Sequence, residues 1–356
     1  MKKQKILVGL SGGVDSAVTA YLLKKEGHDV TAGFMINYLD EQNANCPTRE
    51  DLEVAKQVAQ YLEIPFFTFD YRDEYEEKVL NYMYEWYRKG ITPNPDIMCN
   101  SEVKFRMFLD EALELWFDKI ATGHYARITE ESWKFHLLKW IDQNKDQSYF
   151  LAGLTQDQLS KALFPIGDIE KTQVRDIARE SWLPNAERKD SQWICFVWKV
   201  NMKEFLEKKI KPVPWNVLDT SWNILGKHKG VFYYTIGQRK WLDIGGQKEA
   251  IFVVKKDLEK NEIIVWTDKD ITLYWNELVM NNINFIQDKD DIFLDNKQLK
   301  ACSKIRYRQA DQGCSVTEHE KWKYKVVFSS EQRAIASGQI CAIYLWDDLV
   351  MSGIIS

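Results

Sequence analysis

The sequence lacks the features of a membrane protein or of a small disulfide-rich one. No apolar run approaches the roughly 18 residues that a membrane-spanning helix needs. The start of the chain briefly resembles a signal peptide, but Ser-Gly-Gly interrupts its apolar stretch and no cleavage-site pattern follows. The six cysteines lie far apart with no CxxC pair, which argues against a zinc ribbon and a dense disulfide framework. We therefore expect a cytoplasmic protein that binds no membrane and whose functional cysteines, if any, are reactive thiols.

The chain also lacks a strong excess of charge of one sign. Its 48 Lys and Arg residues against 53 Asp and Glu residues give a net charge of −5, which argues against indiscriminate coating of nucleic acid. A local basic patch remains possible in such a chain. Apolar residues make up 45% of the sequence and charged residues 28%, as in globular proteins. A length of 356 residues exceeds one ordinary domain, so we expect two or three.

Strand-like and helix-like segments alternate from the start of the chain to about residue 125. This alternation predicts an α/β fold with a doubly wound parallel sheet, in which ligands bind at the carboxyl ends of the strands. After about residue 205, short β-like runs separated by turns predict antiparallel sheets or a small barrel. Boundaries near residues 205 and 268 give domains 1–205, 206–268 and 269–356. The predicted strands are 6–10, 29–36, 65–69 and a run ending near 123, and the predicted helices are 15–27, a segment capped by Thr48, 73–87 and 101–115.

A loop rich in glycine and hydroxyl groups, residues 11–16, lies between the first predicted strand and the first predicted helix. Unpaired N–H groups and the positive end of the helix dipole can meet phosphate oxygens there. Gly12 and Gly13 allow close approach, and Ser11 and Ser16 add hydroxyl donors. The loop has neither the lysine of a Walker A motif nor a GxGxxG pattern. It predicts a pyrophosphate site, and the alternative is a glycine-rich turn without a ligand.

Two cysteines are candidate nucleophiles. Cys99 follows a proline-stiffened loop between two predicted helices, so we expect it to be presented rather than buried. A helix starting at about Ser101 would stabilise its thiolate, and Asp96 is close enough in sequence to accept a proton. The alternative is an unreactive loop cysteine. Cys195 lies in Ile-Cys-Phe-Val, and its residues alone favour a buried strand in which cysteine acts as a small hydrophobe.

A basic segment lies between Asp295 and Asp311 and contains no acid. If 304–308 is a strand, three cationic side chains share one face at a spacing of about 7 Å, which suits successive phosphates, and Tyr307 points the other way. The alternative is a solvated edge strand whose charges discourage aggregation. The basic residues are Lys297, Lys300, Lys304, Arg306 and Arg308.

Six motifs in order give the chain a resemblance that runs essentially end to end. They are the 11–16 loop, TPNPDIMCNSEVKF, IATGHYAR, NKDQSYFL, KDSQWICF and YTIGQRK. Together they resemble the bacterial tRNA-specific 2-thiouridylases of the PP-loop ATP pyrophosphatase superfamily. The resemblance implies a PP-loop catalytic domain, a small central domain and a C-terminal β-barrel that contacts tRNA. It also implies an enzyme that uses ATP to adenylate O2 of the wobble uridine and replaces that oxygen with sulfur, releasing AMP and pyrophosphate.

The same resemblance implies which residues bind the nucleotide and carry the chemistry. Cys195 would carry a persulfide, and Cys99 would act as partner nucleophile and close a disulfide with it, with Asp96 assisting proton transfer. Mg²⁺ is implied to bridge the phosphates without a metal site made by the protein. An iron–sulfur cluster on the two cysteines is the weaker alternative. The implied nucleotide-binding residues are Gly9, Leu10, Ser11, Gly12, Gly13, Val14, Asp15, Ser16, Met35 and Gly123.

The implied partners are tRNA and a persulfide sulfur donor, either a cysteine desulfurase or a sulfur carrier protein. Without the resemblance, His124 would be only a polar residue at a strand end. The implied tRNA-binding residues are Asn94, Pro95, Asp96, His124, Lys145, Asp146, Gln147, Arg306 and Tyr307.

Glycine is scarce and tryptophan abundant in this chain. The 356 residues include 17 glycines, which is fewer than the usual share of about 7% would give, and 14 tryptophans. Several tryptophans stand where glycine is expected: Trp182 at a helix end, and Trp215, Trp222, Trp275 and Trp346 in turn contexts. The resembling family has glycine at positions matching Trp116, Trp182, Trp193, Trp198 and Trp241.

One cause would account for these tryptophans. We hypothesise that the source reads the codon UGA as glycine, whereas the printed sequence translates it as tryptophan. If the tryptophans are genuine instead, a catalytically impaired tRNA-binding protein becomes the rival interpretation. A third is another adenylating enzyme of the superfamily, such as an amide-forming synthetase, which would not need two cysteines.

Overall fold

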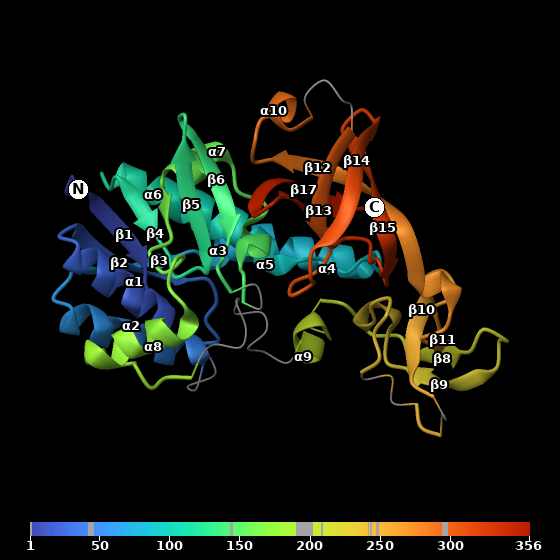
Figure 1. The fold of residues 1–356 in the computed structure, drawn as a ribbon. Helices are drawn as coiled ribbons and strands as arrows, with labels where there is room; N and C mark the ends of the chain where they lie inside the picture. The colour runs from blue at the N-terminus through green and yellow to red at the C-terminus, as the bar shows by residue number, and fades with distance from the viewer. Residues whose placement is uncertain are drawn as a thin grey trace.

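The computed structural model describes residues 2–41, 46–142, 145–189, 202–207, 209–240, 242, 244–246, 249–293 and 298–356. Its strands form three sheets, which follow one another along the molecule (Figure 1). Cys195 lies outside the described residues, and so do Trp193, Trp198 and Trp241. Among the described helices, none combines the length and apolar character needed to cross a bilayer.

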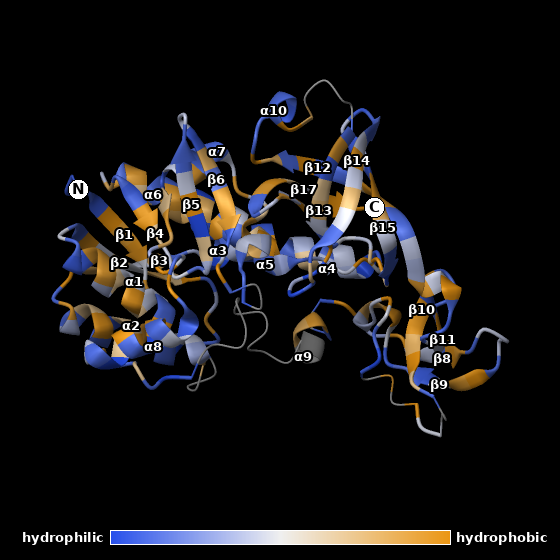
Figure 2. Cartoon of the chain, viewed as in Figure 1, coloured by the Kyte–Doolittle hydropathy of each residue, from blue (hydrophilic) through white to orange (hydrophobic). Residues whose placement is uncertain are grey.

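The first sheet is parallel and confirms the predicted doubly wound α/β fold. Its strand order is β3-β2-β1-β4-β7. Ile6 and Val8 on one face pack into a core with α1 and α2, whereas Leu7 faces a second core that includes Phe108. Figure 2 shows β4 as largely hydrophobic and α8, on the outside, as largely hydrophilic. The strands are β1 (Lys5–Gly9), β2 (Asp29–Ile36), β3 (Phe66–Asp70), β4 (Lys119–Ala121) and β7 (Ala162–Leu163); the flanking helices are α1 (Val14–Lys25), α2 (Pro47–Tyr61) and α8 (Lys171–Glu180).

Two helical stretches on this sheet contain π-helical segments. The first runs through α3 (Arg72–Tyr75), η1 (Glu76–Leu80) and α4 (Asn81–Arg88), and the second through α5 (Pro95–Met98), η2 (Cys99–Met107) and α6 (Phe108–Glu114). The predicted start of the second helix near Ser101 is wrong. Asn94 caps it, because its side-chain oxygen accepts from Ile97 N–H at 3.3 Å and Pro95 occupies the first helical position.

The predicted cap at Thr48 is also wrong. The helix begins one residue earlier, at Pro47, and Cys46 precedes it. The hydroxyl of Thr48 instead donates to the carbonyl of Tyr38 at 2.8 Å. Proline again suits the first helical position, because it has no N–H that would need an acceptor there.

The second and third sheets confirm a small central domain and a C-terminal barrel. The central sheet has the order β10-β11-β8-β9. In the barrel, β12-β15-β14-β13-β16-β17 form a closed ring through the additional pairing of β12 with β17. The strands are β8 (Trp215–Leu218), β9 (Ile224–His228), β10 (Ile251–Asp257), β11 (Glu262–Thr267), β12 (Tyr274–Phe285), β13 (Gln298–Lys304), β14 (Gln312–Glu320), β15 (Lys323–Arg333), β16 (Ile340–Leu345) and β17 (Asp348–Ile355).

A hairpin from the N-terminal half joins the barrel sheet. It consists of β5 (Ala126–Glu131) and β6 (Lys134–Lys139), and Leu138 pairs with Asp348 of β17. This pairing attaches the barrel to the parallel-sheet region through backbone as well as side chains. The boundaries near 205 and 268 stay predictions. The remaining short helices are η3 (Ser148–Leu151), α7 (Gln156–Ser160), α9 (Met202–Glu207), η5 (Val231–Tyr233), η6 (Ile271–Leu273) and α10 (Lys289–Phe293).

The backbone at several tryptophans is unusual. Six of the described tryptophans have positive φ, between 53° and 67°, and their side chains are 62–93% exposed: Trp116, Trp133, Trp182, Trp222, Trp322 and Trp346. A left-handed conformation costs an L-residue roughly 1–2 kcal/mol. The expected helix-end position of Trp182 is confirmed, since it directly follows the C-cap Ser181 of α8. The predicted turns at Trp215 and Trp275 are wrong, because these residues lie in β8 and β12.

Candidate functional site

The predicted phosphate loop lies at the carboxyl end of β1, where the chain turns into α1. Ser16 Oγ donates to the carbonyl of Gly13 at 2.9 Å, and Ser11 N–H donates to Ser16 Oγ at 3.2 Å, so the loop folds over the start of the helix. The first N–H groups of a helix have no acceptor within it. Here the first bond of α1 runs from Ala17 N–H to the carbonyl of Gly13 at 3.2 Å. The N–H groups of Val14, Asp15 and Ser16, in the first turn of α1, are therefore available to an anion.

Two glycines in this region have no substitute. Gly12 has a φ of +78°, and a Cβ there would lie 2.5 Å from the carbonyl oxygen of Asp51. A Cβ on Gly123, at the end of β4, would lie 2.8 Å from backbone atoms of Asp15 and Ser16. By contrast, a Cβ on Gly13 would meet only Ser11 Oγ, at 3.4 Å. Close packing of backbone on backbone thus explains why Gly12 and Gly123 occur where the sequence predicted nucleotide contact.

Residues far away in sequence hold the loop in place. The carbonyl of Gly12 accepts from Asn185 Nδ2 at 2.9 Å and from Arg188 Nη1 at 3.1 Å, and Arg188 also pairs with Asp51 at 2.8 Å. Sequence reasoning missed Asn185 and Arg188, because nothing in their local sequence indicates which loop they reach.

The acidic residue of the loop is neutralised within the fold. Asp15 Oδ1 accepts from Tyr125 Oη at 2.7 Å and pairs with Lys171 Nζ at 2.6 Å. The Lys171 ammonium also lies 5.1 Å from the centre of the Tyr125 ring. This pairing offsets the carboxylate charge that would otherwise repel a phosphate group at the same helix terminus.

The remaining predicted nucleotide residues surround the same strand end. Leu10 is fully buried and Val14 is 4% exposed, so both anchor the loop to the core. Met35 lies near the end of β2, with its Cε 3.3 Å from the position of a Cβ on Gly9. The structure therefore brings together the residues predicted to bind nucleotide.

Cys99 lies in a different setting from the one predicted. It is 3% exposed and is the fifth residue of the helix that begins at Pro95, so the expectation of a presented thiol just before a helix start is wrong. The reason is the Asn94–Pro95 helix start, which places Cys99 beyond the first turn. Asp96 lies in that first turn and is 8% exposed. No disulfide joins the cysteines that the structure describes.

Three predicted tRNA-contact segments converge near this helix start. The Tyr307 and Phe150 rings lie 4.4 Å apart between centroids, which brings the barrel to the segment that follows Gln147. Burial raises the pKa of Tyr307, and the negative charges of Asp146 and Asp96 add to the shift. Both carboxylates therefore lie close to this barrel residue. The hydroxyl of Tyr149, in the same segment as Phe150, donates to the carbonyl of Ile340 in β16 at 2.9 Å.

The loop before the helix is held by both other domains. Gln339 of the barrel region donates to the carbonyl oxygens of Thr92 at 2.9 Å and of Pro93 at 3.2 Å. The hydroxyls of Thr92 and Thr235 lie 2.9 Å apart, which ties the loop to the YTIGQRK motif. The position of Asn94 and Pro95 thus depends on contacts across the domains.

Two residues predicted to contact tRNA are buried. His124 is 6% exposed, and its Nδ1 lies 2.7 Å from Thr122 Oγ1. Burial, aided by the charge of Lys104, holds the pKa of His124 well below its usual value, so the ring is neutral. Asp146 is 3% exposed. In this arrangement neither side chain reaches solvent, whereas Lys145 and Gln147 on either side of Asp146 are partly exposed.

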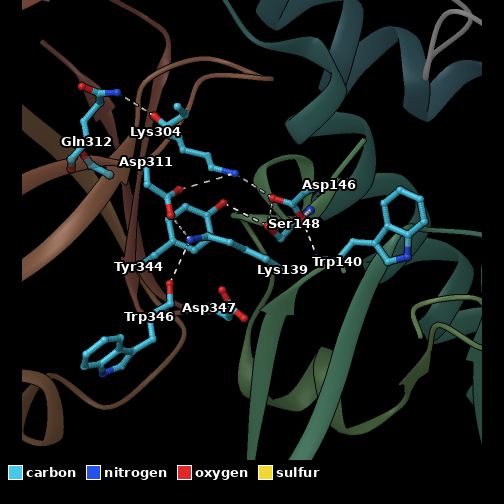
Figure 3. A network of polar contacts seen from close by, with 12 residues as sticks. Lys139, Trp140, Asp146, Ser148, Lys304, Asp311, Gln312, Tyr344, Trp346 and Asp347 are labelled. Carbon is cyan, nitrogen blue, oxygen red and sulfur yellow. Dashed lines mark hydrogen bonds and ion pairs between the residues drawn. The ribbon is translucent and has the colours of Figure 1, made fainter. Parts of the chain in front are cut away.

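The predicted basic strand over 304–308 is wrong. β13 ends at Lys304, and Arg308 has a φ of 62° in the bend that follows. Lys304 is 4% exposed. Its ammonium group pairs with the carboxylates of Asp146 at 3.0 Å and Asp311 at 3.8 Å (Figure 3). Arg306 is partly buried and donates to the carbonyl of Arg333, and burial lowers its pKa. Of the three cations that the predicted strand would have aligned, Lys304, Arg306 and Arg308, only Arg308 is exposed.

Among the described residues, no group of three or more His, Cys, Asp or Glu side chains could hold a metal ion. A metal at the phosphate loop would therefore take most of its ligands from phosphate and water. Mg²⁺ commonly binds in this way.

Family models cover almost the whole chain. The model described as tRNA methyl transferase HUP domain matches residues 4–199, the tRNA methyl transferase PRC-barrel domain matches 203–267, and the aminomethyltransferase beta-barrel domain matches 275–355.

Curated relatives match over nearly their full length. The tRNA-specific 2-thiouridylase MnmA of Bacillus subtilis is 41% identical over 99% of this chain and 94% of its own. MnmA 1 of Geobacillus kaustophilus is 44% identical over 100% and 96%. Among solved structures, the U34-tRNA thiolase NcsA of Methanococcus maripaludis is 18% identical over 59% of this chain and 68% of its own, with a TM-score of 0.36. That score is too low to carry an argument, so the assignment rests on the sequence relatives.

Proposed function

The chain belongs to the family of tRNA-specific 2-thiouridylases, and on this premise we propose that it replaces O2 of the wobble uridine in tRNA with sulfur, in an ATP-dependent reaction. The observation that best supports the proposal is the phosphate loop at the end of β1. Gly12 is required there by its positive φ and by backbone packing, the acidic residue of the loop is neutralised, and the first N–H groups of α1 are available to an anion.

The chemistry requires an activated oxygen. The C2 carbonyl of uridine is a poor electrophile, so O2 attacks the α-phosphorus of ATP and the bond to pyrophosphate breaks. The loop is suited to hold the departing pyrophosphate through backbone N–H groups and the hydroxyls of Ser11 and Ser16. Bound Mg²⁺ would supply positive charge to the phosphate oxygens. The O2 atom then leaves with AMP when sulfur attacks C2.

We propose that the sulfur comes from a persulfide on Cys195, which lies outside the described residues. The outer sulfur bonds to C2 as AMP leaves. Cys99 then attacks the inner sulfur of Cys195, which breaks the persulfide S–S bond, leaves the outer sulfur on C2 and closes a disulfide that a reductant must open before the next turnover. Asp96, three residues earlier on the same helix, would assist proton transfer.

The assay is ATP-dependent formation of 2-thiouridine on unmodified tRNA with a persulfide donor, read by nucleoside analysis. We expect product only with ATP, and none from Cys99→Ser or Cys195→Ser although both variants still bind tRNA. Bound tRNA without product in the wild-type protein would instead support an impaired tRNA-binding protein. The family's full-length relatives favour the enzyme over that reading and over an amide-forming synthetase.

A further inference from the structure

A chain of alternating charges, three of them buried, links the predicted tRNA loop to the barrel (Figure 3). Lys304 Nζ lies 3.0 Å from Asp146 Oδ2 and 3.8 Å from Asp311 Oδ1, and Lys139 Nζ lies 2.6 Å from Asp311 Oδ2. The side chains of Asp146, Lys139 and Lys304 are only 1%, 2% and 5% exposed. Two cations and two anions thus alternate, so that each buried charge has an opposite neighbour.

Asp146 is fully occupied inside this network. Its Oδ1 accepts from the backbone N–H groups of Trp140 at 3.1 Å and Ser148 at 3.0 Å. Its Oδ2 accepts from Ser148 Oγ at 2.9 Å as well as from Lys304. Ser148 Oγ also lies 3.1 Å from the hydroxyl of Tyr344 in β16. No acceptor position of the carboxylate is left for an RNA group.

We propose that Asp146 and Lys304 are positioning residues that set the tRNA-contacting segments relative to each other and do not touch tRNA themselves. Asp146 lies between Lys145 and Gln147, and Lys304 lies two residues before Arg306. One ion pair therefore ties together the two loops that carry these predicted contacts. Removing one partner leaves a buried charge uncompensated, so the loops must shift. The inference rests on the proposed function, because it presupposes that tRNA binds here.

A double-mutant cycle on tRNA affinity tests the proposal. Asp146→Asn and Lys304→Met are each expected to weaken tRNA binding about tenfold, to raise KM for tRNA and to leave ATP affinity unchanged. The double variant holds no uncompensated charge. Its affinity for tRNA should therefore be no lower than that of whichever single variant binds tRNA more weakly. Lys300→Met, an exposed lysine of the same strand, is the matched control and should change affinity less than Lys304→Met.

The outcomes separate the inference from the function it rests on. If the wild-type protein binds no tRNA, the proposed function fails. If it binds tRNA but the two single effects multiply in the double variant, both side chains contact tRNA independently and the positioning role is wrong. Single variants that bind as tightly as wild type would overturn it as well. Should one single variant not fold, the double variant still decides. Weaker tRNA binding by the double variant than by the single variant that does fold contradicts the proposal.

A separate observation comes from the helix ends. Five of the described helices, α1, α2, α4, α6 and α8, end with the same two hydrogen bonds: the residue after the C-cap donates to the carbonyl three residues back, and the next residue to the carbonyl five back. The residue after the C-cap is Gly27, Glu63, Gly90, Trp116 and Trp182, with φ of 88°, 48°, 66°, 64° and 53°. Glycine predominates at this position because it has no Cβ. The backbone at the two tryptophans is thus that of the two glycines.

The other four tryptophans with positive φ lie in turns. Trp133 follows Ser132 in the two-residue turn between β5 and β6, where both φ values are positive, as in turns that favour Asn-Gly. Trp346 is the first of the two residues between β16 and β17. Trp140 is the contrast: it is 2% exposed, and its indole N–H donates to the carbonyl of Ile169 at 3.2 Å. The remaining two tryptophans with positive φ are Trp222 and Trp322.

We infer that the six tryptophans with positive φ are glycine in the protein that the source cell makes, through UGA codons read as glycine. The positions share a backbone that glycine adopts freely, and their side chains extend into solvent. The same substitution would raise the low glycine count of the chain. A random replacement of glycine by tryptophan at six left-handed positions has no comparable physical reason.

Two measurements test this inference. The gene should carry UGA at all six positions and UGG at Trp140, and peptides of the protein isolated from its source should contain glycine at the six. UGG codons or tryptophan-containing peptides there would overturn it. Independently, replacing the six by glycine should raise the midpoint of thermal unfolding, whereas the matched control Trp140→Gly should lower it. A lower midpoint for the six-glycine protein would contradict the backbone argument.

Discussion

The proposed nucleotide end and the proposed tRNA end of the site are built differently. The phosphate loop occupies six consecutive residues, 11–16, which run from just after β1 into the first turn of α1, and Gly123, two residues after β4, packs against it. The tRNA end is assembled from segments around residues 94, 146 and 306, which the barrel and the central domain hold in place. The first is specified locally, whereas the second exists only when the three domains are correctly placed.

This difference has a consequence for how the protein fails. A change in the loop should remove ATP binding and leave tRNA binding intact. A change in the interdomain contacts should weaken tRNA binding and leave the loop intact. The chemistry needs both ends, because adenylation joins a group held by the loop to a base held by the distributed segments.

The largest effect is expected at the proposed nucleophile. Cys99→Ser should lower thiolation on the order of 10³-fold or more, because a hydroxyl cannot replace the thiol that closes the disulfide. Affinities for ATP and tRNA should stay at wild-type values, which separate binding measurements can check. Buried Cys341→Ser, in the barrel core, is the matched control. Thiolation that survives Cys99→Ser would remove this residue from the mechanism.

Gly12→Ala should break the nucleotide end alone. A left-handed alanine costs about 1–2 kcal/mol, and its Cβ would lie 2.5 Å from a carbonyl oxygen, so ATP affinity should fall at least about tenfold. Titration with ATP measures the loss, and tRNA binding should not change. Gly27→Ala has the same positive φ but open space around it, and should leave ATP affinity at the wild-type value. Equal ATP affinity in the Gly12 variant would show that the loop does not bind the nucleotide.

Gln339→Leu should weaken the tRNA end alone. It removes the hydrogen bonds to the carbonyls of Thr92 and Pro93, each worth about 0.5–1.5 kcal/mol, so tRNA affinity should fall roughly tenfold. ATP affinity is expected to remain constant. Gln298→Leu, on an exposed position of β13, serves as the control. A parallel loss of ATP affinity would mean that the two ends are not independent.

The smallest effect concerns pH. Burial holds the pKa of His124 well below its usual value of about 6.5, so below that pH the unfolded chain binds a proton that the folded chain does not. Stability should therefore fall as the pH drops below about 6.5, with a slope of at most about 1.4 kcal/mol per pH unit from this group. Urea unfolding of His124→Gln should show a flatter dependence, whereas exposed His319→Gln should match wild type. The buried His228 contributes in the same direction.

The parts of the molecule that the sequence predicted well are those determined by neighbouring residues. The 11–16 loop, the alternating strands and the helix end at Trp182 follow from local pattern. The start of the helix at Pro95 was mispredicted, because the asparagine–proline cap six residues upstream outcompetes a start at Ser101. Both Trp215 and Trp275 were misassigned to turns because flanking asparagines suggested them.

The rest could not be predicted because it depends on distant residues. The sequence around Lys304 predicts an exposed phosphate ligand, whereas in the structure Asp146 and Asp311 lie beside its ammonium group. The pairing of β6 with β17 and the contacts of Asn185 and Arg188 with the loop likewise join segments that no local pattern connects. The barrel was expected as a class, but its closure through β12 and β17 is a tertiary result.

The central claim, that the loop and the tRNA end act on one uridine oxygen, is tested most directly by following that oxygen. Unmodified tRNA carrying ¹⁸O at O2 of the wobble uridine would be incubated with the protein, ATP and a persulfide donor, and the released AMP analysed by mass spectrometry. We predict one ¹⁸O atom in AMP for each 2-thiouridine formed. Thiolated tRNA accompanied by unlabelled AMP would contradict adenylation at O2.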